Sequence, residues 1–483
     1  MKARIFAEEN KKWWTLAAVA FGLFMIMLDN TVVNVALPSI ERDLHMSISE
    51  LEWIVTAYAL VFASLLITGG KLADLLGRRR IFVVGLVVFT LSSLACGLAP
   101  TAGFLIGARA VQGVGAALMN PATLSIITAT FPPRQRGTAI GIWAGVSALA
   151  LAIGPLAGGL IVDNINWNWI FFINVPVGIA GVIASRIFIT ESRDTSHEQS
   201  VDLPGLATSG LGLFALTYAL IEGNRHGWGS PEIVGLFVAA AVLLAAFVLV
   251  EHRQRLPMLD LSLFRNSSFT GANIVALLVS LGMFGVFFYV SLYIQNVLGY
   301  SPTQAGAMFL PMTLLIILVA PFAGRASDRL GSRWLMGGGM TLLGVSLLLY
   351  QRAGIHSDFW TLLPAMILGG VGMASTMSPM TSAAMGAVPV DKAGVGSGVL
   401  NSFRQVGGAL GIAAMGAILA SYLPASVAPR SAAAGQAYVD GMHAALAVSA
   451  GIVFAGAIVA ILLVHVKPQA ERTHVREMEV GAA

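Results

Sequence analysis

The sequence predicts an all-α polytopic membrane protein whose fourteen transmembrane helices form two six-helix bundles plus two inserted helices. Three observations support this prediction. Hydrophobic residues make up 57% of the chain and charged residues only 11%, whereas about 25% charged residues is usual in a soluble domain. Fourteen apolar stretches of roughly 20 residues follow one another, the length that crosses a hydrocarbon core of ~30 Å. A glycine-rich basic turn also occurs twice, once in each half of the chain.

The apolar stretches are separated by polar turns or by turns that contain glycine or proline. The first is too long for a signal-peptide apolar region and lacks a small-residue cleavage site, so we expect it to be retained as a span. The single cysteine, Cys96, excludes an internal disulfide, and no metal site is indicated. The predicted spans cover residues 13–37, 51–70, 81–100, 103–128, 137–162, 168–189, 203–222, 232–250, 269–295, 303–324, 334–351, 359–386, 396–421 and 442–465.

The distribution of lysine and arginine predicts the orientation. The chain has 28 such residues, of which two, Arg109 and Arg404, fall within predicted spans. One set of connecting segments holds only Arg42, Arg225, Arg352 and Arg430, and the other set, which includes both termini, holds all the rest. Because cytoplasmic loops carry an excess of Lys and Arg, both termini are expected in the cytoplasm. The net charge of +4 is explained by this orientation, and no basic patch interleaved with aromatic residues indicates nucleic-acid binding.

The repeated turn indicates two related halves. Residues 70–80 and 324–333 share the pattern Gly-x3-Asp-x2-Gly with trailing arginines. A basic turn alone would explain the arginines but not the repeated Asp and Gly. The match predicts an N-terminal bundle over 1–195, two inserted helices over 196–265, a C-terminal bundle over 266–466 and a cytoplasmic tail over 467–483, with halves that rock about a central site. The residues expected to latch an inner gate are Gly70, Asp74, Gly77, Arg78, Asp328, Gly331 and Arg333.

One carboxylate, Asp29, is predicted to lie well inside a span, where an ionisable residue is a functional candidate by default. Asp29, Tyr58 and Arg109 each lie roughly 9–12 Å below the outer end of their spans at ~1.5 Å per residue, so one pocket can hold all three. Asp29 is therefore the candidate proton-binding group and Arg109 its partner. A static buried ion pair that only orients helices is the alternative. Glu222, at the outer end of a span, is the second candidate carboxylate, with a capping or solvated role as its alternative.

Other intramembrane polar residues are candidates for a substrate cavity. Arg404 is expected near an inner gate or domain interface, because an intramembrane arginine faces a cavity or a partner; the alternative is hydrogen bonding to carbonyls at the span end. The full set of cavity candidates is Asn30, Asn34, Tyr58, Gln112, Asn401 and Arg404.

Several motifs together resemble the major facilitator superfamily. Residues 70–80 look like its signature between spans 2 and 3, and residues 109–115 look like its RxxQGxG motif. Gly154, Pro155, Gly158 and Gly159 look like the GPxxGG motif of its exporters, named the antiporter motif. The resemblance implies the major facilitator fold. Pro155 and the glycines are expected to give their span a kink and a groove for a close neighbour, which would seal the outward path.

Fourteen spans, the stretch 29–38, and the stretches 167–176 and 404–411 resemble in particular the 14-span drug:proton antiporters, the EmrB/QacA type of multidrug exporter. Asn168 and Ala150 depart from the residues often found in that family, which affects at most the packing of two spans. The resemblance implies a monomeric, proton-driven exporter of lipophilic drugs or antibiotics in the cytoplasmic membrane, without a cofactor. A proton-coupled exporter or importer of a native metabolite on the same fold is the alternative. No Gly-x4-Gly-Lys-Ser/Thr or His-Glu-x-x-His motif indicates an ATPase or a metalloprotease.

Overall fold

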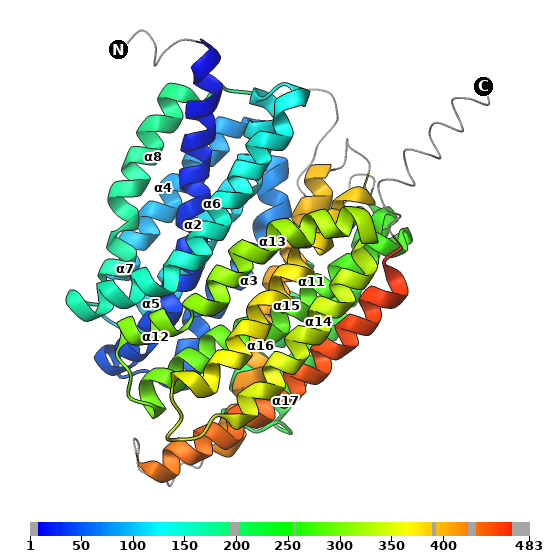
Figure 1. Cartoon of the computed structure of the whole chain (residues 1–483). Helices are drawn as coiled ribbons and strands as arrows, with labels where there is room; N and C mark the ends of the chain where they lie inside the picture. The colour runs from blue at the N-terminus through cyan, green and yellow to red at the C-terminus, as the bar shows by residue number, and fades with distance from the viewer. Residues whose placement is uncertain are drawn as a thin grey trace. The chain divides into compact units, whose positions relative to one another are not determined.

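The computed structural model describes residues 8–193, 202–254, 257, 259–388, 393–423 and 431–465, and within these ranges the regular elements are all helices (Figure 1). The helices are α2 (Glu8–Leu44), α3 (Ile48–Leu76), α4 (Arg78–Gly97), α5 (Ala102–Thr130), α6 (Pro133–Asn164), α7 (Trp169–Phe172), α8 (Asn174–Phe188), α9 (Leu203–His226), α10 (Pro231–Arg253), η1 (Leu261–Arg265), α11 (Ser267–Leu292), η2 (Tyr293–Val297), α12 (Pro302–Met308), α13 (Leu310–Leu330), α14 (Ser332–Leu349), η3 (Tyr350–Arg352), α15 (Phe359–Gly386), α16 (Ala393–Tyr422) and α17 (Ala432–Leu463).

The predicted all-α membrane architecture is confirmed. Among the described residues, thirteen helical segments are long and apolar enough to cross a membrane. The one predicted span without a counterpart among them, 137–162, lies within the continuous helix α6. The protein is therefore a multi-pass membrane protein.

Two predicted spans are broken by a proline. The span predicted over 168–189 consists of α7 and α8, and that over 303–324 consists of α12 and α13. Pro176 and Pro311 follow the two breaks. A proline ring clashes with the carbonyl four residues earlier and lacks a backbone N–H, so a continuous helix is disfavoured at both places.

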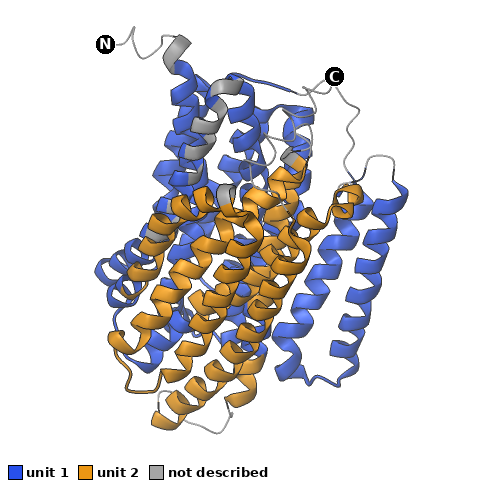
Figure 2. Cartoon of the chain, turned by 45° about the vertical axis from the view of Figure 1, so that its right-hand side comes forward, with its two compact units in different colours: residues 1–259, 290–307, 412–417 blue, residues 260–289, 308–411, 418–483 orange. Residues whose placement is uncertain are grey.

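The chain forms two compact units, coloured separately in Figure 2. Unit 1 comprises residues 1–259, 290–307 and 412–417, and unit 2 comprises 260–289, 308–411 and 418–483. Within unit 2, α15 packs against both α13 and α14, and α14 packs against α17.

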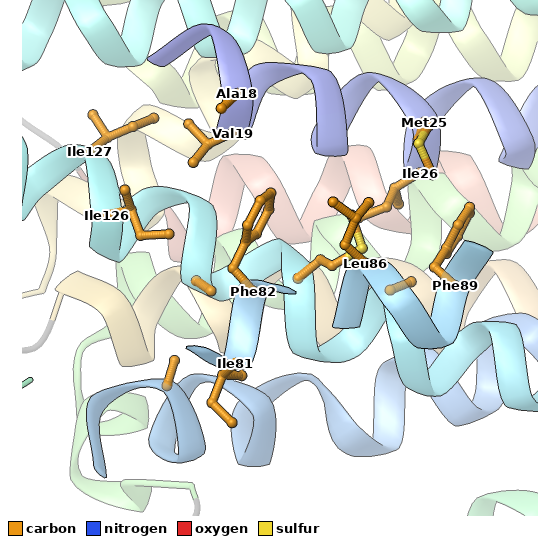
Figure 3. Close-up of a cluster of buried hydrophobic side chains, with 14 of the residues drawn as sticks. Ala18, Val19, Met25, Ile26, Ile81, Phe82, Leu86, Phe89, Ile126 and Ile127 are labelled. Carbon is orange, nitrogen blue, oxygen red and sulfur yellow. The ribbon is translucent and has the colours of Figure 1, made fainter. Parts of the chain in front are cut away.

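Unit 1 contains a core of apolar side chains where α2, α4 and α5 meet (Figure 3). Val19 and Ile26 of α2, Phe82 and Phe89 of α4, and Ile127 of α5 are at most 2% exposed in it. Around this core α3 and α4 pack against α5, α2 packs against α6 and α8, and α9 packs against α10 and α3. These contacts fix the faces of α2, α4, α5 and α8 that carry the polar residues described below.

Candidate functional site

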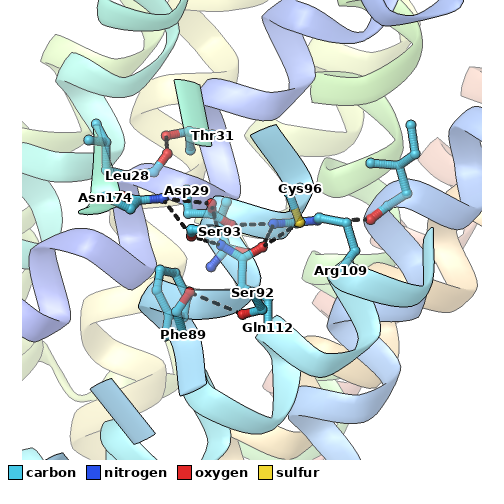
Figure 4. A network of polar contacts seen from close by, with 12 residues as sticks. Leu28, Asp29, Thr31, Phe89, Ser92, Ser93, Cys96, Arg109, Gln112 and Asn174 are labelled. Carbon is cyan, nitrogen blue, oxygen red and sulfur yellow. Dashed lines mark hydrogen bonds and ion pairs between the residues drawn. The ribbon is translucent and has the colours of Figure 1, made fainter. Parts of the chain in front are cut away.

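A buried polar network lies between four helices of unit 1 (Figure 4). Asp29 comes from α2, Ser93 from α4, Arg109 and Gln112 from α5, and Asn174 from the first residue of α8. Each of the five side chains is at most 2% exposed. Arg109 and Gln112 are three residues apart, which places them on one face of their helix.

The two oxygens of the Asp29 carboxylate have different partners. Oδ2 forms the ion pair with Nη1 of Arg109. Oδ1 accepts hydrogen bonds from Nε2 of Gln112 at 3.0 Å and from Nδ2 of Asn174 at 3.3 Å. Ser93 joins the two amides, because its Oγ lies 2.6 Å from Gln112 Nε2 and 3.2 Å from Asn174 Nδ2. The network therefore surrounds the Asp29 carboxylate with hydrogen-bond donors.

Arg109 has partners besides Asp29. Its Nε donates to the backbone carbonyl of Ile54 at 3.1 Å, and its Nη1 donates to Oε1 of Gln112 at 2.6 Å. The guanidinium carbon also lies 4.3 Å from the centre of the Tyr58 ring and 5.8 Å from that of Phe171. A cation over an aromatic face is attracted by the ring quadrupole. These contacts retain part of the arginine's stabilisation when Asp29 is neutral.

The energetics of such a pair are dominated by desolvation. Removing one partner from a buried ion pair typically costs about 3–5 kcal/mol, because the other charge is left uncompensated. A change in the protonation of Asp29 has the same electrostatic consequence as removing its charge. A proton on Asp29 would therefore leave the buried Arg109 charge without its carboxylate partner.

Among the described contacts, the other predicted cavity residues do not hydrogen-bond to Asp29, although Asn30 directly follows it on α2. Asn34 donates to the carbonyl of Asn30 at 3.2 Å, and Asn401 donates to the carbonyl of Ser397 at 3.1 Å, both within their own helices. Arg404 is half-buried in α16 of unit 2. Of the six candidates, Tyr58 and Gln112 contact the Asp29 network directly.

The inner turn of unit 1 connects α3 to α4 at Gly77. Oδ1 of Asp74 accepts from Nε of Arg78 at 2.9 Å across the turn. Gly77 has φ +115°, and a Cβ there would lie 2.8 Å from the Glu191 carboxylate. That carboxylate caps α4 by accepting from the backbone N–H groups of Arg79 at 3.0 Å and Arg80 at 3.2 Å. Gly70 lies one helical turn before Asp74. A Cβ added there would lie 3.4 Å from Pro121 Cβ, so packing does not require a glycine at this position.

The corresponding turn of unit 2 joins α13 to α14. Gly331 has φ +84°, and the guanidinium carbon of Arg333 lies 5.2 Å from the ring centre of Trp334. The side chain of Asp328 lies outside the described part of the structure. The two turns thus share a left-handed glycine between their helices.

The glycines of 154–159 lie where α6 approaches its neighbours within unit 1. A Cβ at Gly154 would overlap Thr31 Oγ1, and one at Gly158 would lie 2.8 Å from Val32 Cγ2, both on α2. A Cβ at Gly159 would overlap the Pro302 carbonyl oxygen at the start of α12. Small residues permit such close backbone packing between membrane helices.

Several polar residues of interest were not singled out from the sequence. Asn174 was a findable candidate, since it is an amide inside a predicted span, whereas Ser93 gives no such signal. Depth along a span left Asp29 as the one interior acid, but among the described residues four acids near helix ends are also buried. Glu222 was the second candidate from the sequence, whereas Glu52, Asp202 and Glu251 were not candidates.

Comparison with known proteins supports a single family. The family model for the Major Facilitator Superfamily matches residues 19–412 and 272–481. Among similar proteins, multidrug resistance protein Stp of Mycobacterium tuberculosis is 37% identical over 86% of this chain and 77% of its own length. Puromycin resistance protein pur8 of Streptomyces alboniger is 37% identical over 96% of this chain and 93% of its own. Methylenomycin A resistance protein of Streptomyces coelicolor is 38% identical over 84% and 85%.

Solved structures agree on the fold. The crystal structure of a bacterial homolog of the human lysosomal transporter Spinster aligns with a TM-score of 0.67 at 16% identity, covering 94% of this chain and 97% of that one. The peptide transporter POT aligns with a TM-score of 0.66 at 16% identity, covering 92% and 93%. The family match, the relatives and the helical architecture lead to one conclusion: the chain belongs to the major facilitator superfamily.

Proposed function

We propose that the protein is a proton-coupled antiporter of the 14-span drug:proton type, which exports lipophilic drugs or antibiotics by alternating access. The observation that supports it most directly is the buried Asp29 carboxylate with Arg109, Gln112 and Asn174 as its donors. The names of the relatives support the substrate class, since they refer to resistance to several drugs, to puromycin and to methylenomycin.

The coupling step follows from hydrogen-bond valence. An ionised carboxylate accepts bonds only, and every partner of Asp29 in the network acts as a donor toward it. A proton on Asp29 adds a donor that has no acceptor in this arrangement unless a neighbour turns. Protonation of Asp29 would therefore make at least one neighbouring side chain turn or give up its hydrogen bond to the carboxylate, and re-formation of the network would require the proton to leave.

Arg109 links protonation of Asp29 to drug binding in this proposal. When Asp29 is neutral, the arginine keeps the Ile54 carbonyl, the Gln112 amide oxygen and the Tyr58 ring as partners. Its positive charge is then available to a different acceptor, and a cationic substrate would be repelled from it. Proton binding and drug binding are thereby made to alternate in one half of the transporter.

Further parts of the proposal rest on the sequence. The two bundles would alternate access to the two faces of the membrane, the turns at Gly77 and Gly331 would close the inner side, and the packing of Gly154 and Gly158 on α2 would limit proton leak. The protein would act as a monomer in the cytoplasmic membrane with both termini inside, and a proton gradient would drive it without a cofactor.

The test is transport of a fluorescent lipophilic cation in everted membrane vesicles, with and without a pH gradient. We expect gradient-driven uptake by the native chain and none by Asp29→Asn at equal membrane content. Glu222→Gln is the matched control, because it also neutralises a buried carboxylate of unit 1, one that accepts from Trp53 Nε1 at 3.4 Å. Gradient-independent uptake, or uptake retained in Asp29→Asn, would contradict proton coupling through Asp29. A native chain that moves no dye would favour a metabolite transporter.

A further inference from the structure

A second cluster of buried ionisable groups lies in unit 1, away from the Asp29 network. Asp202 immediately precedes α9, Glu251 lies in the last turn of α10, and Lys71 lies near the end of α3. Asp202 and Glu251 are each only 3% exposed. Since α9 and α10 cover the two helices predicted to be inserted, this cluster connects the predicted insertion to the helix that leads into the Gly77 turn.

Each of the two carboxylates has one bonded oxygen. Oδ1 of Asp202 accepts from the backbone N–H of Gly205 at 2.7 Å and from Nε2 of Gln254 at 2.6 Å. Oε2 of Glu251 accepts from the backbone N–H of Leu259 at 2.8 Å. These bonds hold both side chains in place. They do not involve the second oxygen of either carboxylate, Oδ2 of Asp202 and Oε1 of Glu251.

The two remaining oxygens are buried and have no hydrogen-bond donor among the described residues. They also lie on the same side of one glycine. A Cβ at Gly205 would overlap Oδ2 of Asp202 and would lie 2.7 Å from Oε1 of Glu251. Both buried acceptor oxygens therefore border this one position, and the two side chains are close enough for a hydrogen bond, so a proton between them would satisfy both oxygens.

The charged groups around Asp202 and Glu251 balance one ionised carboxylate, not two. Among the described residues, Lys71 is the cation whose charge acts on both carboxylates, and its Nζ donates to the carbonyl of Pro257 at 2.7 Å. On α10 itself, His252 and Arg253 are exposed to solvent. With Lys71 as the compensating cation among the described residues, a doubly ionised pair would place two like charges together and leave one of them unbalanced, whereas Lys71 balances the charge of a singly protonated pair. Carboxylates that share a site characteristically hold one proton between them.

We propose that Asp202 and Glu251 form a second proton-binding site, in which one proton held between the two carboxyl groups fastens the inserted helices to Lys71 of α3. The site lies on the face predicted to be cytoplasmic, and loss of its proton would loosen α9 and α10 from α3. This inference does not depend on transport or on Asp29.

The first test uses infrared spectroscopy of the purified full-length chain, with spectra recorded at about neutral pH and at alkaline pH. The proposal predicts a protonated-carboxyl band that disappears on alkalinisation. The band should be missing in Glu251→Gln and in Asp202→Asn, and retained in Glu222→Gln and Asp29→Asn. A native chain without the band, or a band retained in both Glu251→Gln and Asp202→Asn, would overturn it.

Thermal unfolding across the same pH range is the second test. The melting temperature of the native chain should fall as the shared proton is lost, since two buried carboxylates then repel. Glu251→Gln should flatten this fall, because its amide donates to Asp202 at every pH, and Glu222→Gln should keep it. An equal fall in the native chain and in Glu251→Gln would refute the site. Should Glu251→Gln not fold, Asp202→Asn supplies the same comparison from the other side of the pair.

Discussion

Arg109 pairs with Asp29, which lies 80 residues earlier in the chain, and the two side chains are 1% and 0% exposed. A pair this deeply buried is not needed to hold helices together, since well-packed apolar residues of similar volume often serve as well or better. If Asp29 binds a proton as proposed, the contact between α2 and α5 depends on that proton. The predictions below follow from that contact and from the close helix packing around it.

Arg109→Ala should destabilise the protein by about 3–5 kcal/mol, because it leaves the Asp29 charge buried without its cation. Arg109→Lys should retain more stability but lose transport, since an ammonium cannot reproduce the fork that reaches Ile54, Gln112 and Asp29 together. Thermal unfolding and vesicle transport measure the two effects. Arg225→Ala is the control, because that side chain is 74% exposed. Full transport by Arg109→Lys would show that charge alone suffices.

Asn174→Ala removes one donor to Asp29 and one contact to Ser93, at a cost of about 1 kcal/mol. Asn168→Ala is the matched control variant. Asn168 lies in the same stretch of sequence and donates to the Gly97 carbonyl at 2.8 Å, outside the network. Both variants should lose similar stability, but Asn174→Ala alone should reduce the rate of gradient-driven transport per folded molecule. Equal transport by the two would remove Asn174 from the site.

Gly77→Ala should lower stability by about 1–3 kcal/mol from backbone conformation alone, because φ +115° with ψ 128° is sparsely populated by residues with a side chain. The contact of a Cβ with Glu191 at 2.8 Å adds to this cost and disturbs the cap of α4. Gly103→Ala provides the comparison, since a Cβ there meets nothing within 4 Å. Melting temperatures of the two variants test the prediction. Similar values for both would mean that the turn relaxes without strain.

Gly158→Ala should destabilise by about 1–3 kcal/mol through overpacking, because its Cβ would meet Val32 Cγ2 at 2.8 Å and the Val32 carbonyl oxygen at 2.9 Å. Gly145→Ala, on the same helix with open space around it, should be neutral or stabilising, since alanine is the better helix former. Passive proton leak into vesicles should rise for Gly158→Ala and stay unchanged for Gly145→Ala. The reverse order would contradict a sealing role for this packing.

Much of the fold was predictable because a span needs about 20 apolar residues, and such runs stand out in this chain. The breaks before Pro176 and Pro311 were missed, although the prolines were visible, because hydropathy does not register a kink. Depth along each helix correctly placed Asp29, Tyr58 and Arg109 near one another. Depth does not define which way a side chain faces, so Asn34 and Asn401, which bond to their own helices, could not be told apart from Gln112.

Tertiary contacts account for what the sequence did not reveal. Glu191 caps α4 from more than 100 residues away, and Asp202 meets Glu251 because α9 and α10 lie side by side. All three acids lie at or just beyond a helix end, where the sequence offers no reason to expect such contacts. The roles of such residues can be recognised only when it is known which helices pack against each other.

The central claim, that drug and proton alternate through Asp29, is tested most directly by proton release. The purified protein is placed in weakly buffered detergent solution with a pH indicator, and a lipophilic cationic drug is added. The native chain and Glu222→Gln should release protons on drug binding, whereas Asp29→Asn should bind the drug and release none. Release by Asp29→Asn equal to that of the native chain would contradict the account and assign the proton to another group.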